Sequence, residues 1–482
     1  MDTEKSELSE GTEKKLGFLP LTAMVIGSMI GAGIFMIPAS FAAVTGVTGA
    51  FISWAIAGLG MLTLAFVFQA LAVRKPKLEA GVYSYAKEGF GRYTGFVSAI
   101  GYWASACAGN VTYIVLINST LGEFFPALGQ GNTILAMVLG SAVVWLFFFL
   151  TSRGVQQAAF INTVVTVAKL VPILVFIGFM IAFFDIDTFV ANLGGTYPGY
   201  EAGLFDQVQA TMMVTVFVFI GIEGASVYSR YAKTRKAVGS ATVLGFLTVL
   251  CLLMLVSIFP MGVLPQETIA GMHEPSAGGI LQNLVGVSGG IFISVGIIIA
   301  VLGAYLAWTL MAAEVLYTVA QDDTMPELVK KTNKNNAPFG ALIFSAGLTQ
   351  IMLLVSFFSE DALNFALTLT SALALVPYFL SAAFAFKIAL KKDGYDDVPS
   401  GVRTRELVVA AISTLYILFL IYVAGIHLLP LCCLILAPAT IFFIVARKKK
   451  EGAVFTKAEM VLFGILCLGA VFAIVSLIFN IG

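Results

Sequence analysis

Residues 27–35 read GSMIGAGIF and interrupt the first long apolar segment of the chain. Three of these nine residues are glycines, which are poor helix formers. The bilayer core tolerates unwound backbone only where protein or water surrounds it. A second interruption, GIEGA at 221–225, lies in the sixth apolar segment and carries a carboxylate. Two glycine-interrupted spans at matching positions of two halves indicate the substrate site of a secondary transporter.

The composition is typical of a polytopic membrane protein. Hydrophobic residues make up 59% of the 482 residues, charged residues make up 11%, and the mean hydropathy is +0.97. A soluble domain of this length would need far more polar surface. Windows of about 20 apolar residues predict thirteen spans. These spans cover residues 17–45, 49–73, 90–121, 132–151, 157–184, 208–231, 238–263, 284–320, 338–358, 362–390, 406–425, 427–446 and 457–480.

The distribution of basic residues predicts the orientation in the membrane. Apart from Lys169, the 27 Lys and Arg residues all fall in the N-terminal tail or on one side of the predicted spans, which makes 26 of the 27. The opposite connections carry acids, among them Glu123, Asp185 and Glu274. The positive-inside rule then places the N-terminus in the cytoplasm and, after thirteen spans, the C-terminus outside. We therefore predict a multi-pass protein of the bacterial cell (inner) membrane. Its cytoplasmic tail, residues 1–16, does not have the pattern of a cleavable signal peptide.

Three ionisable residues are predicted at bilayer depth, where a charge is costly and is a functional candidate. Glu223, in the second break, either receives a cation or relays a proton, or it braces the loosened backbone. Lys169 either replaces a coupling sodium ion or carries a coupling proton, or it ties the fifth span to carbonyls of the first break. Glu314 either lines an inner vestibule or bridges to basic groups at the membrane surface. The residues alone leave each pair of alternatives open.

The first break suits a carboxylate ligand. A second half-helix begins within residues 31–35, so its free N–H groups and the positive end of its dipole point into the break. The small residues Gly31, Ala32 and Gly33, followed by Ile34, let the backbone itself touch a ligand. The second break offers carbonyl groups to an ammonium. Together the two breaks match a zwitterionic α-amino acid.

These segments resemble the amino acid–polyamine–organocation (APC) transporter superfamily, and within it the basic amino acid/polyamine antiporter group. The resemblance covers residues from 16 to about 450. Its motifs are residues 27–35 with Pro38, FIGIEGAS at 219–226, WTL at 308–310 leading to DDTMP at 322–326, and LVPY at 375–378. The run through Val227 and Tyr228 into a basic loop, the step AAE at 312–314 and a thirteenth span are most similar to arginine/ornithine antiporters.

The resemblance implies an all-α polytopic membrane protein with about thirteen transmembrane helices. Its LeuT-like core would be a 5+5 inverted repeat with helices 1 and 6 broken. The first repeat would comprise residues 17–184 and the second residues 206–390, whereas residues 406–480 would form three peripheral spans.

The resemblance also implies roles for individual side chains. The counterpart of Trp308 packs on the aliphatic and guanidinium parts of the substrate in arginine/agmatine exchangers, and the counterparts of Asn110 and Phe217 line the same cavity. The implied substrate-binding residues are Ser28, Gly31, Ala32, Gly33, Ile34, Asn110, Phe217, Ile220 and Trp308. The implied coupling or gating residues are Tyr102, Lys169, Glu223, Glu314 and Tyr378.

Three of these positions bear on substrate choice and coupling. Phe217 stands where the arginine/agmatine exchangers have Trp, and Ala32 replaces a serine at the carboxylate end, so the side-chain preference stays open. Lys169 resembles the lysine of proton-coupled members.

We expect an antiporter that exchanges a cationic amino acid, arginine, for a related amino acid or amine such as ornithine. The alternatives are a proton-coupled amino acid symporter, or an antiporter for another pair such as lysine/cadaverine or histidine/histamine. An enzyme is not expected, because no His or Asp/Ser constellation is predicted at bilayer depth. We expect small-molecule substrates and the lipid bilayer as partners, without a cofactor, a metal or a nucleic acid. A homodimer stays open.

Overall fold

The computed structural model describes residues 16–78, 81–153, 155–227, 232–359, 361–424, 428–448 and 453–479. Within these residues the chain is helical, and β-type pairing is limited to two isolated bridges. Eleven helices are long and apolar enough to cross a membrane, and one bent pair brings the number to twelve. The prediction of an all-α polytopic membrane protein is therefore confirmed.

The helices follow the predicted spans closely. The eleven long ones are α4 (Val47–Arg74), α6 (Arg92–Gly122), α7 (Ile134–Ser152), α8 (Val155–Ala182), α12 (Arg235–Ile258), α15 (Val287–Gln321), α16 (Phe339–Ser356), α17 (Ala362–Lys391), α18 (Ser400–Ala424), α19 (Leu428–Lys448) and α20 (Lys457–Phe479). Shorter elements in the connections are α5 (Val82–Phe90), η1 (Pro126–Leu128), α9 (Ile186–Ala191), η3 (Phe259–Gly262), α13 (Gln266–Ala270), α14 (Ser276–Val285) and η4 (Glu327–Lys330).

Several boundaries differ from the predicted ones by a few residues, and two of these differences have a clear cause. Gly286 has a φ of +77°, which separates α14 from α15, so the eighth span begins at Val287 and not at residue 284. The eleventh span begins at Ser400 and not at residue 406, because its first turn extends beyond the apolar part of the segment.

Both predicted helix breaks are present. The first span consists of α2 (Phe18–Met29) and α3 (Gly33–Ala42), which are bent by 45° about residues 30–32. The predicted sixth span, 208–231, consists of α10 (Leu204–Phe219), a turn, and the short α11 (Gly224–Val227). Its last four residues, 228–231, and the predicted tail up to residue 15 lie outside the described residues.

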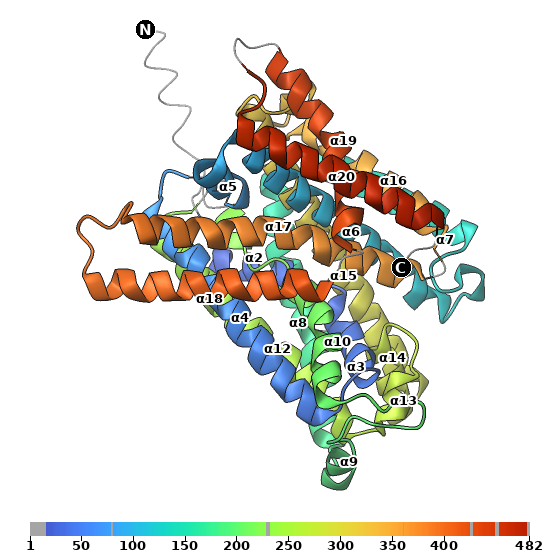
Figure 1. The fold of residues 1–482 in the computed structure, drawn as a ribbon. Helices are drawn as coiled ribbons and strands as arrows, with labels where there is room; N and C mark the ends of the chain where they lie inside the picture. Colours follow the sequence, from blue (N-terminus) through green and yellow to red (C-terminus); the bar gives the residue numbers. More distant parts are fainter. Residues whose placement is uncertain are drawn as a thin grey trace.

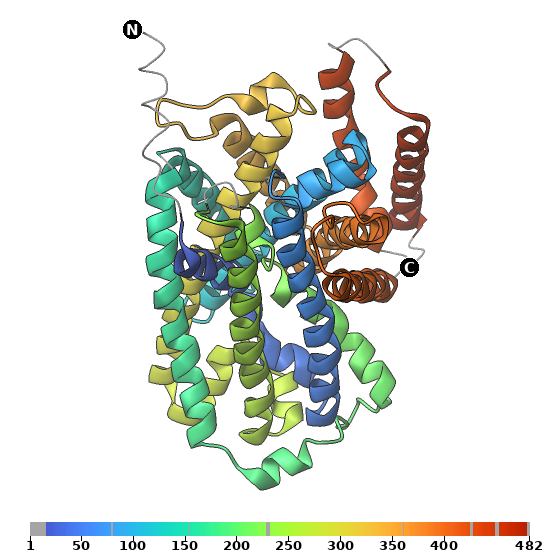
Figure 2. The same cartoon turned by 90° about the vertical axis from the view of Figure 1, so that its left-hand side faces the viewer.

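The broken helices lie inside the bundle. Residues 27–39 of the first span and residues 95–120 of α6 are all buried. By contrast, only 17% of the apolar stretch of α20 is buried, and α18, α19 and α20 lie along one edge of the molecule (Figures 1 and 2). A transmembrane helix that is buried on all sides, such as α6, is a natural wall for an internal site.

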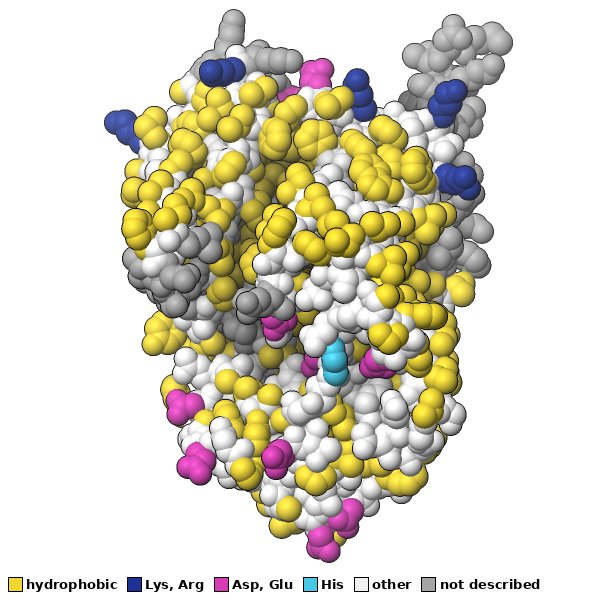
Figure 3. All heavy atoms as spheres, turned by 90° about the vertical axis from the view of Figure 1, so that its right-hand side faces the viewer, with side chains coloured by type: hydrophobic (Ala, Val, Ile, Leu, Met, Phe, Trp, Pro, Cys, Tyr) yellow, Lys and Arg dark blue, Asp and Glu magenta, His cyan; other side chains and the backbone are white. Residues whose placement is uncertain are grey.

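Charged side chains are sorted over the surface. Figure 3 shows acidic side chains over the lower part of one face, with Lys and Arg side chains only toward its upper rim. We call the end of the bundle where α4 and α17 end and where α12 and α18 begin the basic end, because Arg74, Lys236, Lys391 and Arg405 lie in these helix ends. Lys169 is an exception among the described basic residues, since it is buried within the bundle.

Candidate functional site

The two helix breaks touch each other. The Ser28 hydroxyl donates a hydrogen bond of 2.8 Å to the Gly221 carbonyl oxygen. Gly221 has a φ of +110°, and a Cβ atom there would lie 2.7 Å from the Ser28 carbonyl carbon. Glycine is therefore required at 221 both by its backbone conformation and by the close approach of the other break.

The carbonyl end of α2 is already occupied by donors. The Lys169 ammonium, from α8, donates to the carbonyl oxygens of Gly27 and Ile30, the latter at 2.7 Å. The Trp308 indole N–H, from α15, donates to the Ser28 carbonyl oxygen at 2.9 Å. The last carbonyls of a helix have no partner within the helix, so these two side chains complete them. This is the contact that the bracing interpretation of Lys169 requires.

The N–H end of α3 is arranged differently. Among the described residues, no group accepts a hydrogen bond from the N–H groups of residues 31–34. These groups lie at the start of a ten-residue helix, where the dipole is positive. The first break therefore presents satisfied carbonyls on one side and available N–H donors on the other, which is the pattern of an anion site.

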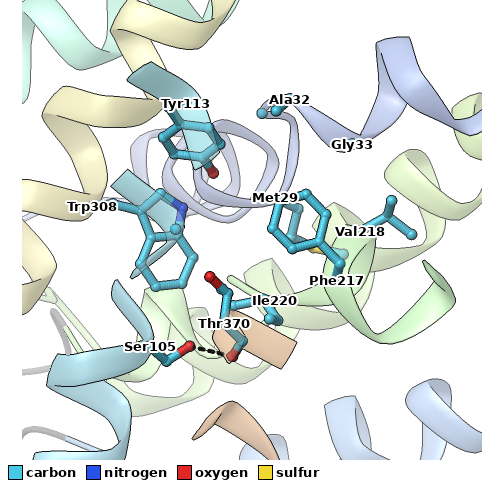
Figure 4. A pocket seen from close by; sticks show the side chains of 12 residues that line it. Met29, Ala32, Gly33, Ser105, Tyr113, Phe217, Val218, Ile220, Trp308 and Thr370 are labelled. Carbon is cyan, nitrogen blue, oxygen red and sulfur yellow. Dashed lines mark hydrogen bonds between the residues drawn. The ribbon is translucent and has the colours of Figure 1, made fainter. Parts of the chain in front are cut away.

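A small cavity lies between the breaks (Figure 4). Its walls come from spans 1, 3, 6, 8 and 10, with Trp308 and Phe217 on opposite sides and Tyr113 above the first break. The centre of a water molecule can move within only about 10 Å³ of it. An amino acid therefore fits only if lining side chains move. The lining residues are Met29, Gly31, Ala32, Gly33, Ser105, Gly109, Tyr113, Phe217, Val218, Ile220, Trp308 and Thr370.

A buried carboxylate joins the second break to two further helices. Glu223 is fully buried and accepts hydrogen bonds from the Tyr102 hydroxyl at 2.8 Å and the Tyr378 hydroxyl at 2.5 Å. The N–H of Gly221 points to the same carboxylate at 3.3 Å. Tyr102 lies on α6 and Tyr378 on α17, so Glu223 ties the break to both walls. The Tyr102 ring also lies 6.0 Å from that of Trp308, which links this network to the cavity.

Comparison with known proteins places this arrangement in a family. The sequence model described as amino acid permease matches residues 16–428. The chain belongs to the amino acid permease family. This permease is 44% identical over 472 residues to an arginine/ornithine antiporter of Pseudomonas aeruginosa, covering 97% of this chain and 98% of the relative.

Other relatives of this permease carry a different name. An arginine/agmatine antiporter of Chlamydia abortus is 39% identical over 477 residues, covering 97% of this chain and 98% of the relative. One of Chlamydia trachomatis serovar D is 37% identical over 463 residues, covering 95% and 96%. The resemblance to the APC superfamily inferred from the motifs is confirmed.

The predicted site residues of the permease fall into two groups. The predicted residues that line the cavity are Gly31, Ala32, Gly33, Phe217, Ile220 and Trp308. Those that do not line it are Ser28, Ile34, Asn110, Tyr102, Lys169, Glu223, Glu314 and Tyr378. Asn110 follows the lining residue Gly109, and its side-chain amide donates to the Thr309 hydroxyl at 3.2 Å. Glu314 is buried on α15.

Sequence reasoning missed half of the cavity. Tyr113 covers the first break so closely that a Cβ at Gly31 would lie 2.5 Å from its hydroxyl oxygen. Ser105, Gly109 and Tyr113 follow one another at four-residue spacing, which places them on one face of α6. That spacing was a usable signal. Thr370 carried no comparable signal, because only the packing of α17 against α6 brings its backbone carbonyl to the Ser105 hydroxyl at 2.8 Å.

The start of α14 and the loop before it hold the second half of α3. The Ser276 hydroxyl accepts from the Ala39 N–H at 3.1 Å and donates to the Met36 carbonyl oxygen at 3.2 Å. The neighbouring Glu274 carboxyl accepts from the Ser276 N–H at 2.8 Å and from the Ser40 hydroxyl at 3.3 Å. Burial raises the pKa of Glu274 to about 8, against the lowering effect of these hydrogen bonds.

Proposed function

We propose that this chain is a secondary transporter that exchanges arginine for a related amino acid or amine, such as ornithine, by alternating access. The observation that carries the proposal is the cavity between two touching helix breaks, with free N–H groups on one wall and aromatic rings on the others. The names of the relatives support arginine as one of the two substrates, since each includes it.

In this proposal each wall takes one part of the substrate. The α-carboxylate binds the N–H groups of residues 31–34, as anions do at helix N-termini. The side chain extends between Trp308 and Phe217, where a guanidinium over an indole face contributes about 0.5–2 kcal/mol. Tyr113 lies directly above the carboxylate position, so it moves when the cavity opens to accept a ligand.

Glu223 is proposed to couple loading to gate movement. Its hydrogen bonds to Tyr102 and Tyr378 connect the second break to α6 and α17. Movement of that break therefore changes the environment of a buried negative charge, which makes the transition sensitive to protons and to a cationic substrate.

The domain boundaries from the sequence fit this proposal. Residues 17–184 and 206–390 would be the two inverted repeats, each opening with its own broken span, and the helices of 406–480 lie at the edge of the molecule. We place the basic end in the cytoplasm by the positive-inside rule, which puts the N-terminus inside and the C-terminus outside. A bacterial inner-membrane location is part of the proposal. Reporter fusions at the two termini test this orientation.

Exchange is tested with proteoliposomes. Vesicles preloaded with ornithine should take up labelled arginine much faster than empty vesicles, because a carrier that reorients mainly when loaded couples the two fluxes. Vesicles preloaded with agmatine, lysine or histidine define the counter-substrate, and protein-free vesicles give the background. Preloading that does not accelerate uptake contradicts the antiporter proposal.

A proton-coupled symporter is the second candidate, and Lys169 is the observation that favours it. Its ammonium occupies the carbonyl end of α2, the position that would attract a cation. Uptake into empty vesicles driven by a pH gradient, and equal to that into preloaded vesicles, would support this candidate instead.

A further inference from the structure

A second cavity, of about 430 Å³, lies between α4, α12, α17 and α18 at the basic end. We call it the basic-end groove. It shares no lining residue with the substrate cavity. Its volume falls in the range of about 300–1,000 Å³ that is usual for ligand sites. Apolar side chains form most of its walls, among them Phe66, Val67, Ala70, Ile388 and Val409.

Two cations line this groove and are available to a ligand. Lys236 is the second residue of α12, and Arg405 lies near the start of α18. Both side chains are exposed, and neither has a hydrogen-bond or ion-pair partner among the described residues. The groove therefore combines apolar walls between transmembrane helices with two unpaired positive charges.

The carboxylate in the lining does not cancel these charges. Glu406 accepts two hydrogen bonds from the Arg74 guanidinium, at 2.8 and 3.0 Å, and a third from the Tyr395 hydroxyl at 2.7 Å. The charges of Glu406 and Arg74 cancel in this bidentate pair, and the carboxylate oxygens already accept hydrogen bonds from both residues that contact them. The charge left for a ligand is that of Lys236 and Arg405, so the ligand that complements the groove is an anion with an apolar part.

We propose that the basic-end groove binds an anionic phospholipid from the adjoining leaflet. Its phosphate contacts Lys236 and Arg405, and an acyl chain lies along the apolar walls. Basic pockets between transmembrane helices bind such head groups, and each basic residue near the surface strengthens anionic-lipid binding about fivefold. Because the two cations belong to different helices, the bound phosphate links α12 to α18. This proposal does not depend on which substrate is transported.

Binding is tested with the purified protein in a neutral detergent, titrated with fluorescent phosphatidylglycerol. The double variant Lys236→Gln/Arg405→Gln should bind this lipid about 25-fold more weakly, the product of two fivefold effects. The matched control, Lys331→Gln/Lys334→Gln, removes two exposed charges outside the groove at the same end and should bind like the wild type. Fluorescent phosphatidylcholine should not distinguish the three proteins.

The acyl-chain part is tested separately. Ala70→Phe keeps both cations and fills the groove, so it should lose phosphatidylglycerol binding while its thermal unfolding in lipid-free detergent stays near that of the wild type. Soluble glycerol phosphate, which carries the head group without a chain, should not displace the lipid. Equal phosphatidylglycerol affinity in the wild type and the double variant overturns the proposal. Displacement by glycerol phosphate overturns it as well, since the groove would then be a site for free anions.

Discussion

Replacing Glu223 with alanine should destabilise the fold, whereas glutamine should mainly slow exchange. The carboxylate accepts from the hydroxyls of Tyr102 and Tyr378 and from the Gly221 N–H. Alanine removes the acceptor of both tyrosine hydroxyls. The Gly221 N–H still has an acceptor, because it also donates to the Tyr378 hydroxyl oxygen at 3.3 Å. Removing the acceptor of a buried donor costs about 1–3 kcal/mol, so the loss for the two hydroxyls is about 2–6 kcal/mol. That is a large part of a typical total stability of about 5–15 kcal/mol.

Glutamine keeps the shape and most of the hydrogen bonds. Its oxygen can accept from Tyr102, while its amide group donates to the Tyr378 oxygen, so the loss of stability should be limited to about 1–3 kcal/mol. The negative charge is gone, however. If that charge responds to protons or to a cationic substrate, arginine/ornithine exchange should slow and lose part of its pH dependence.

The assay combines thermal unfolding in detergent with exchange in proteoliposomes over a range of pH. Glu88→Gln, the same chemical change at an exposed carboxylate of α5, is the matched control and should leave both measurements unchanged. A Glu223→Gln protein with the wild-type rate and pH profile would refute the role of the charge. A Glu223→Ala protein as stable as the wild type would refute the bracing geometry.

Four further changes test other parts of the structure. Gly221→Ala should lower the unfolding temperature, because a strained left-handed backbone alone costs about 1–3 kcal/mol and the Cβ meets the other break; an unchanged temperature would contradict the close approach. Lys169→Met should remove the donor from two carbonyls at about 1–3 kcal/mol each while leaving the pH profile of exchange unchanged; an altered profile would favour the proton-carrier alternative. Trp308→Leu should weaken arginine binding, measured by calorimetry, by about 0.5–2 kcal/mol, and should weaken binding of the uncharged analogue citrulline by less. Equal losses for the two ligands would mean that the indole contributes only its shape. Glu274→Gln tests how the free energy of unfolding depends on pH. The pKa of Glu274 in the folded state, about 8, is higher than its ordinary value. The stability that this carboxyl contributes is therefore complete below the ordinary pKa and is lost as the pH rises through about 8. The unfolding temperature of the glutamine variant should fall less than that of the wild type as the pH rises over that window. Parallel curves of unfolding temperature against pH for the two proteins would contradict this role of Glu274.

Sequence patterns were sufficient for features that depend on local composition. The spans follow from runs of apolar residues, and the breaks follow from the glycines of 27–35 and 221–225. The sorting of charge between the two ends follows from the connections alone. Hydropathy and helix propensity depend on the residue types alone, so they can be predicted without knowledge of the packing.

Helix periodicity, by contrast, was a weak guide to the inward faces. Residues 95–120 of α6 are buried on every side although they include Ser105, Asn110 and Thr112, whereas the more apolar α20 is mostly exposed. Lipid tails are as apolar as leucine, so a membrane helix need not show a polar side toward its surroundings. This is why Thr370 was missed as a cavity residue, whereas the four-residue spacing of Ser105, Gly109 and Tyr113 could have identified Tyr113.

By itself the sequence determined an all-α membrane protein with two interrupted spans, a charge-sorted surface and three ionisable residues predicted at bilayer depth. Only the tertiary structure decided what those residues contact: Glu223 with Tyr102 and Tyr378, and Lys169 with the carbonyls at the end of α2. The physical reason is that a buried charge needs partners, but any polar group of a neighbouring helix can supply them. The sequence therefore indicates that partners exist, and the packing of the helices selects which ones they are.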